Sequence, residues 1–97
     1  MKANLLTKLL TETNDVIKMK LLLKALFTSK ELKELDNRLS IFQMLIKGKK
    51  QREISEELGV GIATVTRGAQ AFENEKIFKI DSNIINTLKK NKFDEWQ

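Results

Sequence analysis

The chain has no cysteine, no histidine and no proline among its 97 residues. Without cysteine it can form neither a disulfide framework nor a thiolate metal site. Without histidine it lacks the side chain that most often serves as a general base, a metal ligand or a pH switch. Carboxylate pairs such as Glu53 and Glu57 occur at helical spacing but look like a solvated face. These absences argue against an enzyme and against a bound metal or cofactor.

Glycine and long apolar runs are also scarce. The four glycines all lie between positions 48 and 68, so the first 47 residues contain no strong helix breaker. No apolar run approaches the roughly 20 residues that span a bilayer, and the polar start of the chain does not resemble a secretory signal. We therefore expect a cytoplasmic protein with no membrane partner. The length suffices for a single domain over 1–97.

Positive charge is what the chain has in excess. Lysine and arginine together number 18, against 13 aspartates and glutamates, which gives a net charge of +5. Such a balance suits a polyanionic partner, either nucleic acid or an anionic membrane surface. An ordinary lysine-rich surface would give the same balance, so charge alone leaves these alternatives open.

Apolar residues recur at helical spacing along the chain, which predicts an all-α fold. The expected helices cover 2–11, then from a cap at Thr13 or Asn14 to about 27, then from a capping box at Thr28–Glu31 to about 47. A last helix is expected over about 81–91, followed by a frayed tail over 92–97. The second helix is apolar over too much of its circumference for one stripe. We expect a second copy of the chain to bury it, which predicts a homodimer.

The third helix carries one apolar side, and Gly48 is expected to end it in a left-handed conformation. Ile41 joins that side. The stripe itself consists of Leu32, Leu35, Leu39, Phe42, Leu45 and Ile46.

Residues 51–74 meet the requirements of a helix-turn-helix. Ile54 and Leu58, four residues apart, supply the apolar face of the first helix, and Gly59 can take the positive φ that the turn needs. The motif also needs a small residue at the helix crossing, an apolar residue after the turn and an apolar anchor in the second helix. These requirements are met by Ser55, Val60 and Val65.

The outward face of the second helix is small and polar, so it could approach base edges in duplex DNA. Basic residues before it would contact phosphates and fix affinity and register. The alternative is a pair of packed helices that bind no nucleic acid. The residues expected to contact DNA are Ile62, Ala63, Thr64 and Thr66 at the bases, with Lys50, Gln51 and Arg52, and also Lys49, at the start of the first helix of the motif.

Gly68 interrupts the second helix at a position where this motif usually carries an apolar residue. Glycine there costs roughly 1 kcal/mol relative to alanine. One explanation is close packing against another helix. The other is a flat ligand that lies against the exposed backbone, with Arg67 binding its carboxylate or stacking over its ring.

The run Gly-Ile-Ala-Thr-Val-Thr-Arg-Gly at 61–68 resembles the tryptophan repressor family. So do 51–54, 35–39 and 45–48, and the resemblance covers about 15–90. It implies a six-helix, intertwined homodimer that represses genes of tryptophan biosynthesis or uptake with L-tryptophan as corepressor. The dimerisation core would be 1–47 and 81–91, and the DNA-reading head 51–74.

By position, the resemblance implies that Arg67 binds the carboxylate of tryptophan with help from Thr28. Arg38 would stack on the indole, and Gly68 would leave room for the ring. The sequence also departs from the family. Ala71 stands where a serine hydroxyl commonly lies near the amino group of the ligand, the turn over 48–51 is one residue shorter, and Phe27 is bulkier than usual. The alternative is therefore a related DNA-binding regulator that responds to another ligand or to none.

Overall fold

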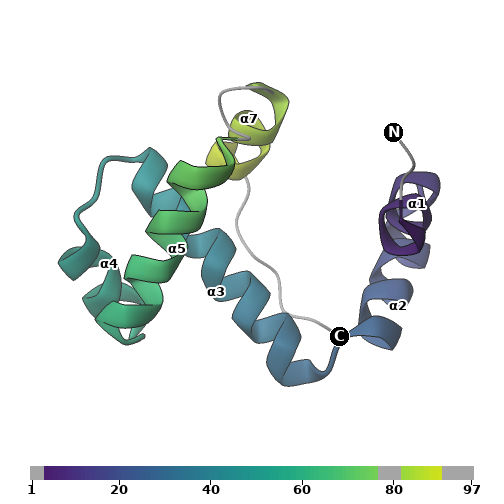
Figure 1. The fold of residues 1–97 in the computed structure, drawn as a ribbon, viewed down its shortest axis with the longest axis horizontal. Helices are drawn as coiled ribbons and strands as arrows, with labels where there is room; N and C mark the ends of the chain where they lie inside the picture. Colours follow the sequence, from purple (N-terminus) through teal and green to yellow (C-terminus); the bar gives the residue numbers. More distant parts are fainter. Residues whose placement is uncertain (1–3, 77–81, 91–97) are drawn as a thin grey trace. The chain divides into compact units, whose positions relative to one another are not determined.

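The computed structural model describes residues 4–76 and 82–90, and within these ranges the secondary structure is helical (Figure 1). This confirms the all-α prediction. None of the described helices is long and apolar enough to cross a membrane. The helices are α1 (Leu5–Glu12), α2 (Val16–Leu26), α3 (Ser29–Ile46), α4 (Gln51–Leu58), α5 (Ile62–Glu75) and α7 (Ser82–Lys90).

The chain divides into two compact units, residues 1–33 and residues 34–97, with the boundary inside α3. The first unit holds α1, α2 and the start of α3. The second holds the rest of α3 together with α4, α5 and α7. The single domain over 1–97 stays a prediction, and the frayed tail predicted over 92–97 lies outside the described residues.

Side-chain caps decide where the first helices begin. Asp15 is the N-cap of α2, because its carboxylate accepts the backbone N–H of Lys18 at 2.8 Å. The predicted cap at Thr13 or Asn14 is therefore wrong. Thr13 instead ends α1, where its hydroxyl donates to a backbone carbonyl one turn earlier at 2.7 Å. α1 starts at residue 5, after the cap residue Asn4, and not at residue 2.

The capping box at the start of α3 is confirmed. The Thr28 N–H donates to the Glu31 carboxylate at 2.9 Å, and the Glu31 N–H donates to the Thr28 hydroxyl at 3.1 Å. The hydrogen bonds from Thr28, the backbone one foremost, lower the pKa of the Glu31 carboxyl below its ordinary value because they stabilise the charged form.

α1 and α2 leave many of their apolar side chains open to solvent. No residue of α1 or α2 is buried, and Val16 and Ile17 expose 84% and 72% of their surface. Leu5 and Leu21 are also mostly exposed. Large exposed apolar patches are typical of surfaces that bind another protein or a membrane. Within one chain, α2 is not buried on several sides.

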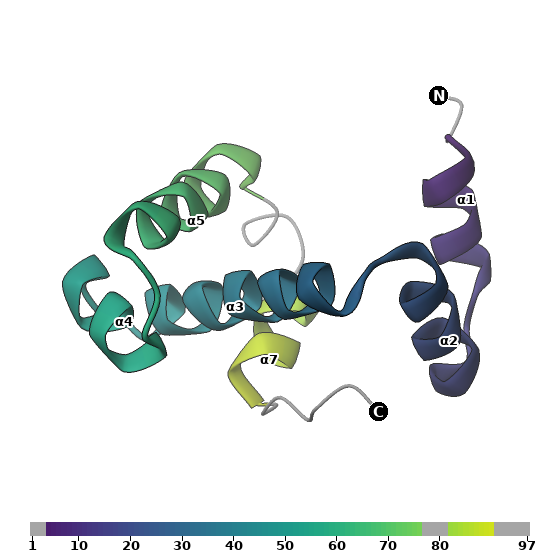
Figure 2. The same ribbon diagram turned by 90° about the horizontal axis from the view of Figure 1, so that it is seen from below.

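The core of the second unit is a triad of side chains from three helices. Ile41 of α3, Ile54 of α4 and Val65 of α5 are each 1% exposed or less. In both views α4 and α5 lie next to each other and beside α3 (Figures 1 and 2). The residues packed around the triad are Met44, Leu45, Leu58 and Val60.

The sequence placed Ile41 on the same side of α3 as the predicted stripe, and the structure buries it at the centre of the core. Leu35 and Leu39, members of the predicted stripe, expose 41% and 37% of their surface. The difference arises because a broad apolar helix has two candidate faces, and spacing alone does not say which face the neighbouring helices cover.

α7 is joined to the rest of the second unit through α3. The side-chain amide of Gln43 donates to the Leu88 carbonyl at 2.6 Å. α7 covers 82–90, close to the helix predicted over 81–91. The rings of Phe42 and Phe72 lie 5.7 Å apart between their centroids, which adds an aromatic contact between α3 and α5.

Gly68 is buried where α5 approaches α3. A Cβ atom added at this position would lie 3.0 Å from Cγ2 and 3.3 Å from Cδ1 of Ile41. Contacts that short require a neighbour to shift, and Ile41 is itself enclosed in the core. Of the two explanations for this glycine, close packing against another helix therefore accounts for it within the chain.

We expect Gly68→Val to lower the free energy of unfolding by about 1–3 kcal/mol, the usual range for overpacking a core. Gln70→Val is the matched control, because Gln70 is exposed on the same helix. Urea denaturation of both variants measures the difference. Equal stability of the two variants would contradict the close contact between α5 and Ile41.

Candidate functional site

The turn between α4 and α5 is fixed at both ends. Gly59 has a φ of +67°, in the left-handed region that glycine adopts without strain, as predicted. The hydroxyl of Ser55 donates to the Val60 carbonyl at 2.6 Å, while the Val60 side chain packs against the core. Ser55 was predicted only as a small residue at the helix crossing. Its hydroxyl also ties α4 to the turn, and the helix-turn-helix geometry is confirmed.

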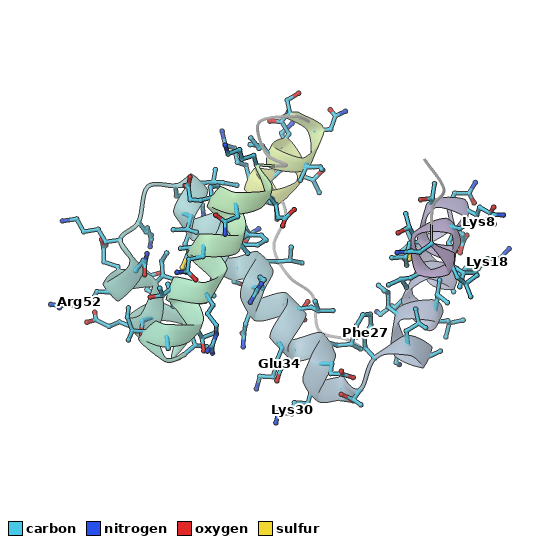
Figure 3. The ribbon with its side chains drawn as sticks, in the orientation of Figure 1. Lys8, Lys18, Phe27, Lys30, Glu34 and Arg52 are labelled. Carbon is cyan, nitrogen blue, oxygen red and sulfur yellow. The ribbon has the colours of Figure 1, made fainter. Side chains whose placement is uncertain are left out.

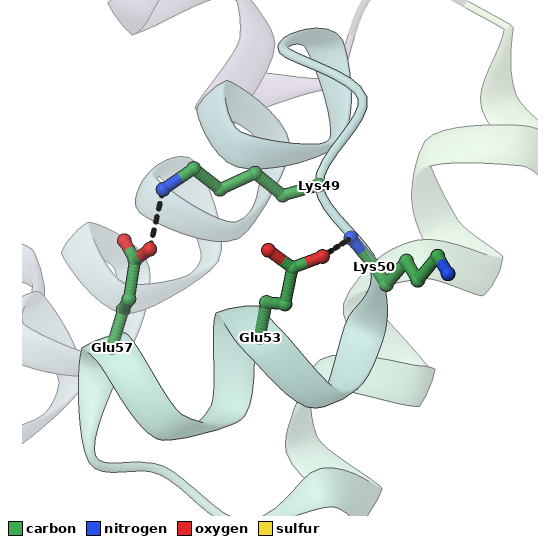
Figure 4. Close-up of polar contacts among 4 residues, drawn as sticks. All are labelled: Lys49, Lys50, Glu53 and Glu57. Atoms are coloured by element: carbon green, nitrogen blue, oxygen red, sulfur yellow. Dashed lines mark hydrogen bonds and ion pairs between the residues drawn. The ribbon is translucent and has the colours of Figure 1, made fainter.

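The short segment before α4 is held by two glutamates of that helix (Figure 4). The Glu53 carboxylate accepts the backbone N–H of Lys50 at 3.2 Å. The Lys49 ammonium forms an ion pair with the Glu57 carboxylate one turn further along. Gly48, with a φ of +82°, lets the chain leave α3. The acidic pair that looked like a solvated face therefore orders the entry to the head.

The start of α4 and the start of α5 lie together. The Thr66 hydroxyl donates to the side-chain oxygen of Gln51 at 2.8 Å, which joins the first turn of α4 to the second turn of α5. Near this contact Ile62 is 52% exposed and Ala63 is also exposed.

Basic side chains flank the same contact. Lys50 and Arg52 are exposed, and the Arg52 side chain projects away from α4 (Figure 3). Six of the eight residues predicted to contact DNA thus lie around one contact between the two helices, at Lys50, Gln51, Arg52, Ile62, Ala63 and Thr66.

A cavity of about 490 Å³ opens between α3 and the first turns of α5. Its volume lies within the range of about 300–1,000 Å³ typical of sites for small molecules. Residues at helical spacing on one face of α3 form one wall. The turn before α5 and one face of α5 form the other. The lining residues are Glu34, Asn37, Arg38 and Ile41 from α3, and Val60, Gly61, Thr64 and Arg67 from the opposite wall.

Arg38 and Arg67, both predicted to bind a ligand, line this cavity from opposite walls. Guanidinium groups donate paired hydrogen bonds to carboxylates and stack on flat rings. The cavity can therefore bind an anionic group, and Ile41 and Val60 offer it an apolar surface.

The other two predicted ligand residues, Thr28 and Gly68, do not line the cavity. Gly68 is not among the lining residues, but it packs against Ile41, which is, so Gly68 shapes the wall from behind. Thr28 belongs to the other unit, where its N–H and hydroxyl form the capping box. Contact between Thr28 and a ligand stays a prediction.

Thr64 lies on the inner face of α5, half-buried in the cavity wall. It was predicted to read DNA bases from the outward face. The structure places it beside Arg67 on the side that faces α3, because positions 61, 64 and 67 recur at helical spacing. Direct contact between Thr64 and DNA stays a prediction.

Glu34 and Asn37 were missed by the sequence analysis. The signal for them was the spacing 34, 37, 38 and 41, which places all four residues on one face of α3 together with Arg38. Within residues 4–76 and 82–90 the structure has one salt bridge, between Lys49 and Glu57, so no ion pair joins Glu34 to Arg38 or Arg67. The same ranges hold no cluster of carboxylates that could bind a metal ion.

A family model and several curated relatives of this chain carry the same name, that of the Trp repressor. The family model described as Trp repressor protein matches residues 2–77. A Trp operon repressor homolog of Xylella fastidiosa (strain M23) is 35% identical over 74 residues, which cover 75% of this chain and 80% of that protein. No solved structure gives a significant match.

Two relatives from Vibrio species carry the same name, Trp operon repressor homolog. The one from Vibrio parahaemolyticus serotype O3:K6 is 38% identical over 71 residues, which cover 72% of this chain and 69% of that protein. The one from Vibrio vulnificus (strain YJ016) is 45% identical over 64 residues, which cover 65% of this chain and 59% of that protein.

Proposed function

The chain belongs to the Trp repressor protein family, and we propose that L-tryptophan, bound in the cavity between α3 and α5, raises its affinity for operator DNA. Membership of this family makes it a DNA-binding regulator of transcription and not an enzyme. The observation that carries the proposal is that Arg38 and Arg67 line one cavity from opposite walls.

The chemistry of the cavity suits this ligand. Arg67 would bind the carboxylate of tryptophan, and Arg38 would stack on its indole ring. Ile41 and Val60 would contact the apolar part of the ring. Because the cavity lies between α3 and the second helix of the head, a ligand there could set the position of α5 against the core.

The head would bind DNA through the joined starts of α4 and α5. The second helix would enter the major groove, with Ile62 and Ala63 towards the bases and Lys50 and Arg52 near phosphates. Gly61, the N-cap of α5, has no side chain, so the first amides of that helix stay open to a phosphate oxygen.

The exposed apolar surface of α1 and α2 supports a homodimer. A chain of this size that leaves Val16 and Ile17 open to water gains stability when a second copy covers them. A dimer would also present two heads to the two halves of a near-palindromic operator.

The relatives are named for the Trp operon, so the regulated genes would be those of tryptophan biosynthesis or uptake. We expect the protein to act in the cytoplasm, with the DNA. One observation favours a second candidate, a related regulator with another ligand or none. Ala71 offers no hydroxyl at the position where the family resemblance implies a serine beside the amino group of the ligand.

We expect calorimetric titration with L-tryptophan, in the absence of DNA, to show saturable binding at one site per chain. Arg67→Ala should weaken binding by about 10-fold or more, because a charge-assisted pair contributes roughly 1.5–3 kcal/mol. Arg52→Ala, which removes an exposed arginine outside the cavity, is the control. No heat with the unaltered chain up to millimolar tryptophan would favour the second candidate.

Ala63→Glu should weaken binding to a duplex selected by the unaltered protein by about 10-fold or more, equivalent to about 1.4 kcal/mol. The reason is that a carboxylate on this face would meet the phosphates and the base edges. Asn74→Glu is the control, because it makes the same change of charge on an exposed residue at the far end of α5. Electrophoretic mobility shifts measure both affinities, and equal losses in the two variants would remove the start of α5 from the groove.

Sedimentation equilibrium at micromolar concentration should give a mass near twice the 11.2 kDa of one chain. Ile17→Glu should shift the mass towards one chain, because a charge on this surface opposes its burial. Thr11→Glu, exposed on α1, is the control. A monomeric mass for the unaltered chain would refute the dimer.

A further inference from the structure

Two positive side chains and one negative side chain line the cavity between α3 and α5. Arg38 and Glu34 are one turn apart on α3, and Arg67 lies on the opposite wall. All three are exposed, so they line its open part. Glu34 projects from α3 (Figure 3). The hydrogen bonds and the ion pair described above give this carboxylate no structural role.

This charge pattern discriminates between classes of ligand. A simple carboxylate would gain from the arginines but would be repelled by Glu34. A simple cation would gain from Glu34 but would be repelled by two guanidinium groups. A ligand that carries both an anionic and a cationic group avoids both repulsions, because each of its charges has an opposite partner in the cavity.

We propose that Glu34 is the residue that selects a zwitterionic amino acid over the same molecule without its amino group, by accepting hydrogen bonds from the ligand ammonium. This inference rests on the proposed function, which assigns the carboxylate to Arg67. It adds a cation-binding residue on α3, whereas Ala71 of α5 offers no hydroxyl where the family resemblance implies a serine beside the amino group of the ligand.

The competing role for Glu34 is a pairing with Arg38 in solution, since the two residues have the i, i+4 spacing that favours such a pair. The two roles differ in what they predict for ligands. A partner of Arg38 would change the binding of every carboxylate alike when it is removed. A partner of the ligand ammonium would change the binding of amino acids alone.

The test titrates the intact chain and its Glu34→Gln variant with L-tryptophan and with 3-(indol-3-yl)propionate, which has the same ring and carboxylate but no amino group. We expect the unaltered chain to prefer tryptophan. Glu34→Gln should weaken tryptophan binding by about 10-fold, because the partner of the ammonium group is removed. Binding of the indolepropionate should stay equal or become tighter, because a carboxylate that repels it is removed.

Glu56→Gln is the matched control, because it removes the same charge from an exposed residue of α4 outside the cavity. Thermal unfolding midpoints establish that both variants are folded. An equal change for both ligands in Glu34→Gln, or no change for either, would overturn the inference and leave the proposed function standing. If the unaltered chain binds neither indole compound, the proposed function fails and the inference falls with it.

Discussion

The contact between Gly68 and Ile41 sets the distance between α3 and α5, and the rest of the second unit depends on it. With no side chain at position 68, the backbone of α5 can approach Ile41 closely enough for Val65 to reach Ile54 in the core. The same approach leaves Ile41 as part of the cavity wall. One small residue therefore determines both the packing of α5 and the width of the cavity beside it.

Much of the second unit could be predicted because its requirements are local. Gly59, Val60 and Val65 follow from the geometry of a tight turn between two helices, and each has its predicted place. The start of α2 could not be chosen, because Thr13, Asn14 and Asp15 are all good caps in sequence. Ile41 is buried and Leu35 is not because α4 and α5 pack against the side of α3 that carries Ile41. Spacing within α3 does not contain that information.

In the candidate site too, some residues could be predicted from the sequence and others depend on tertiary packing. Arg67 was predicted from its place before Gly68 and Arg38 from the family resemblance, and the structure brings both to one cavity. Glu34 was missed because a lone glutamate on a charged helix looks like solvated surface until an opposite wall is present. Thr64 was assigned to the outward face because composition does not tell which face of α5 packs against α3. Spacing identifies residues that share a face, but packing decides what that face meets.

The ion pair between Lys49 and Glu57 changes how the positive charge of the head should be counted. A lysine or arginine that neutralises a DNA phosphate releases a condensed counterion, and each release steepens the loss of affinity with added salt. The charge of Lys49 is already balanced within the protein, so among the phosphate contacts proposed at this end of α4 only those of Lys50 and Arg52 would release counterions. Affinity for DNA should therefore fall less steeply with salt than the number of basic residues near α4 suggests.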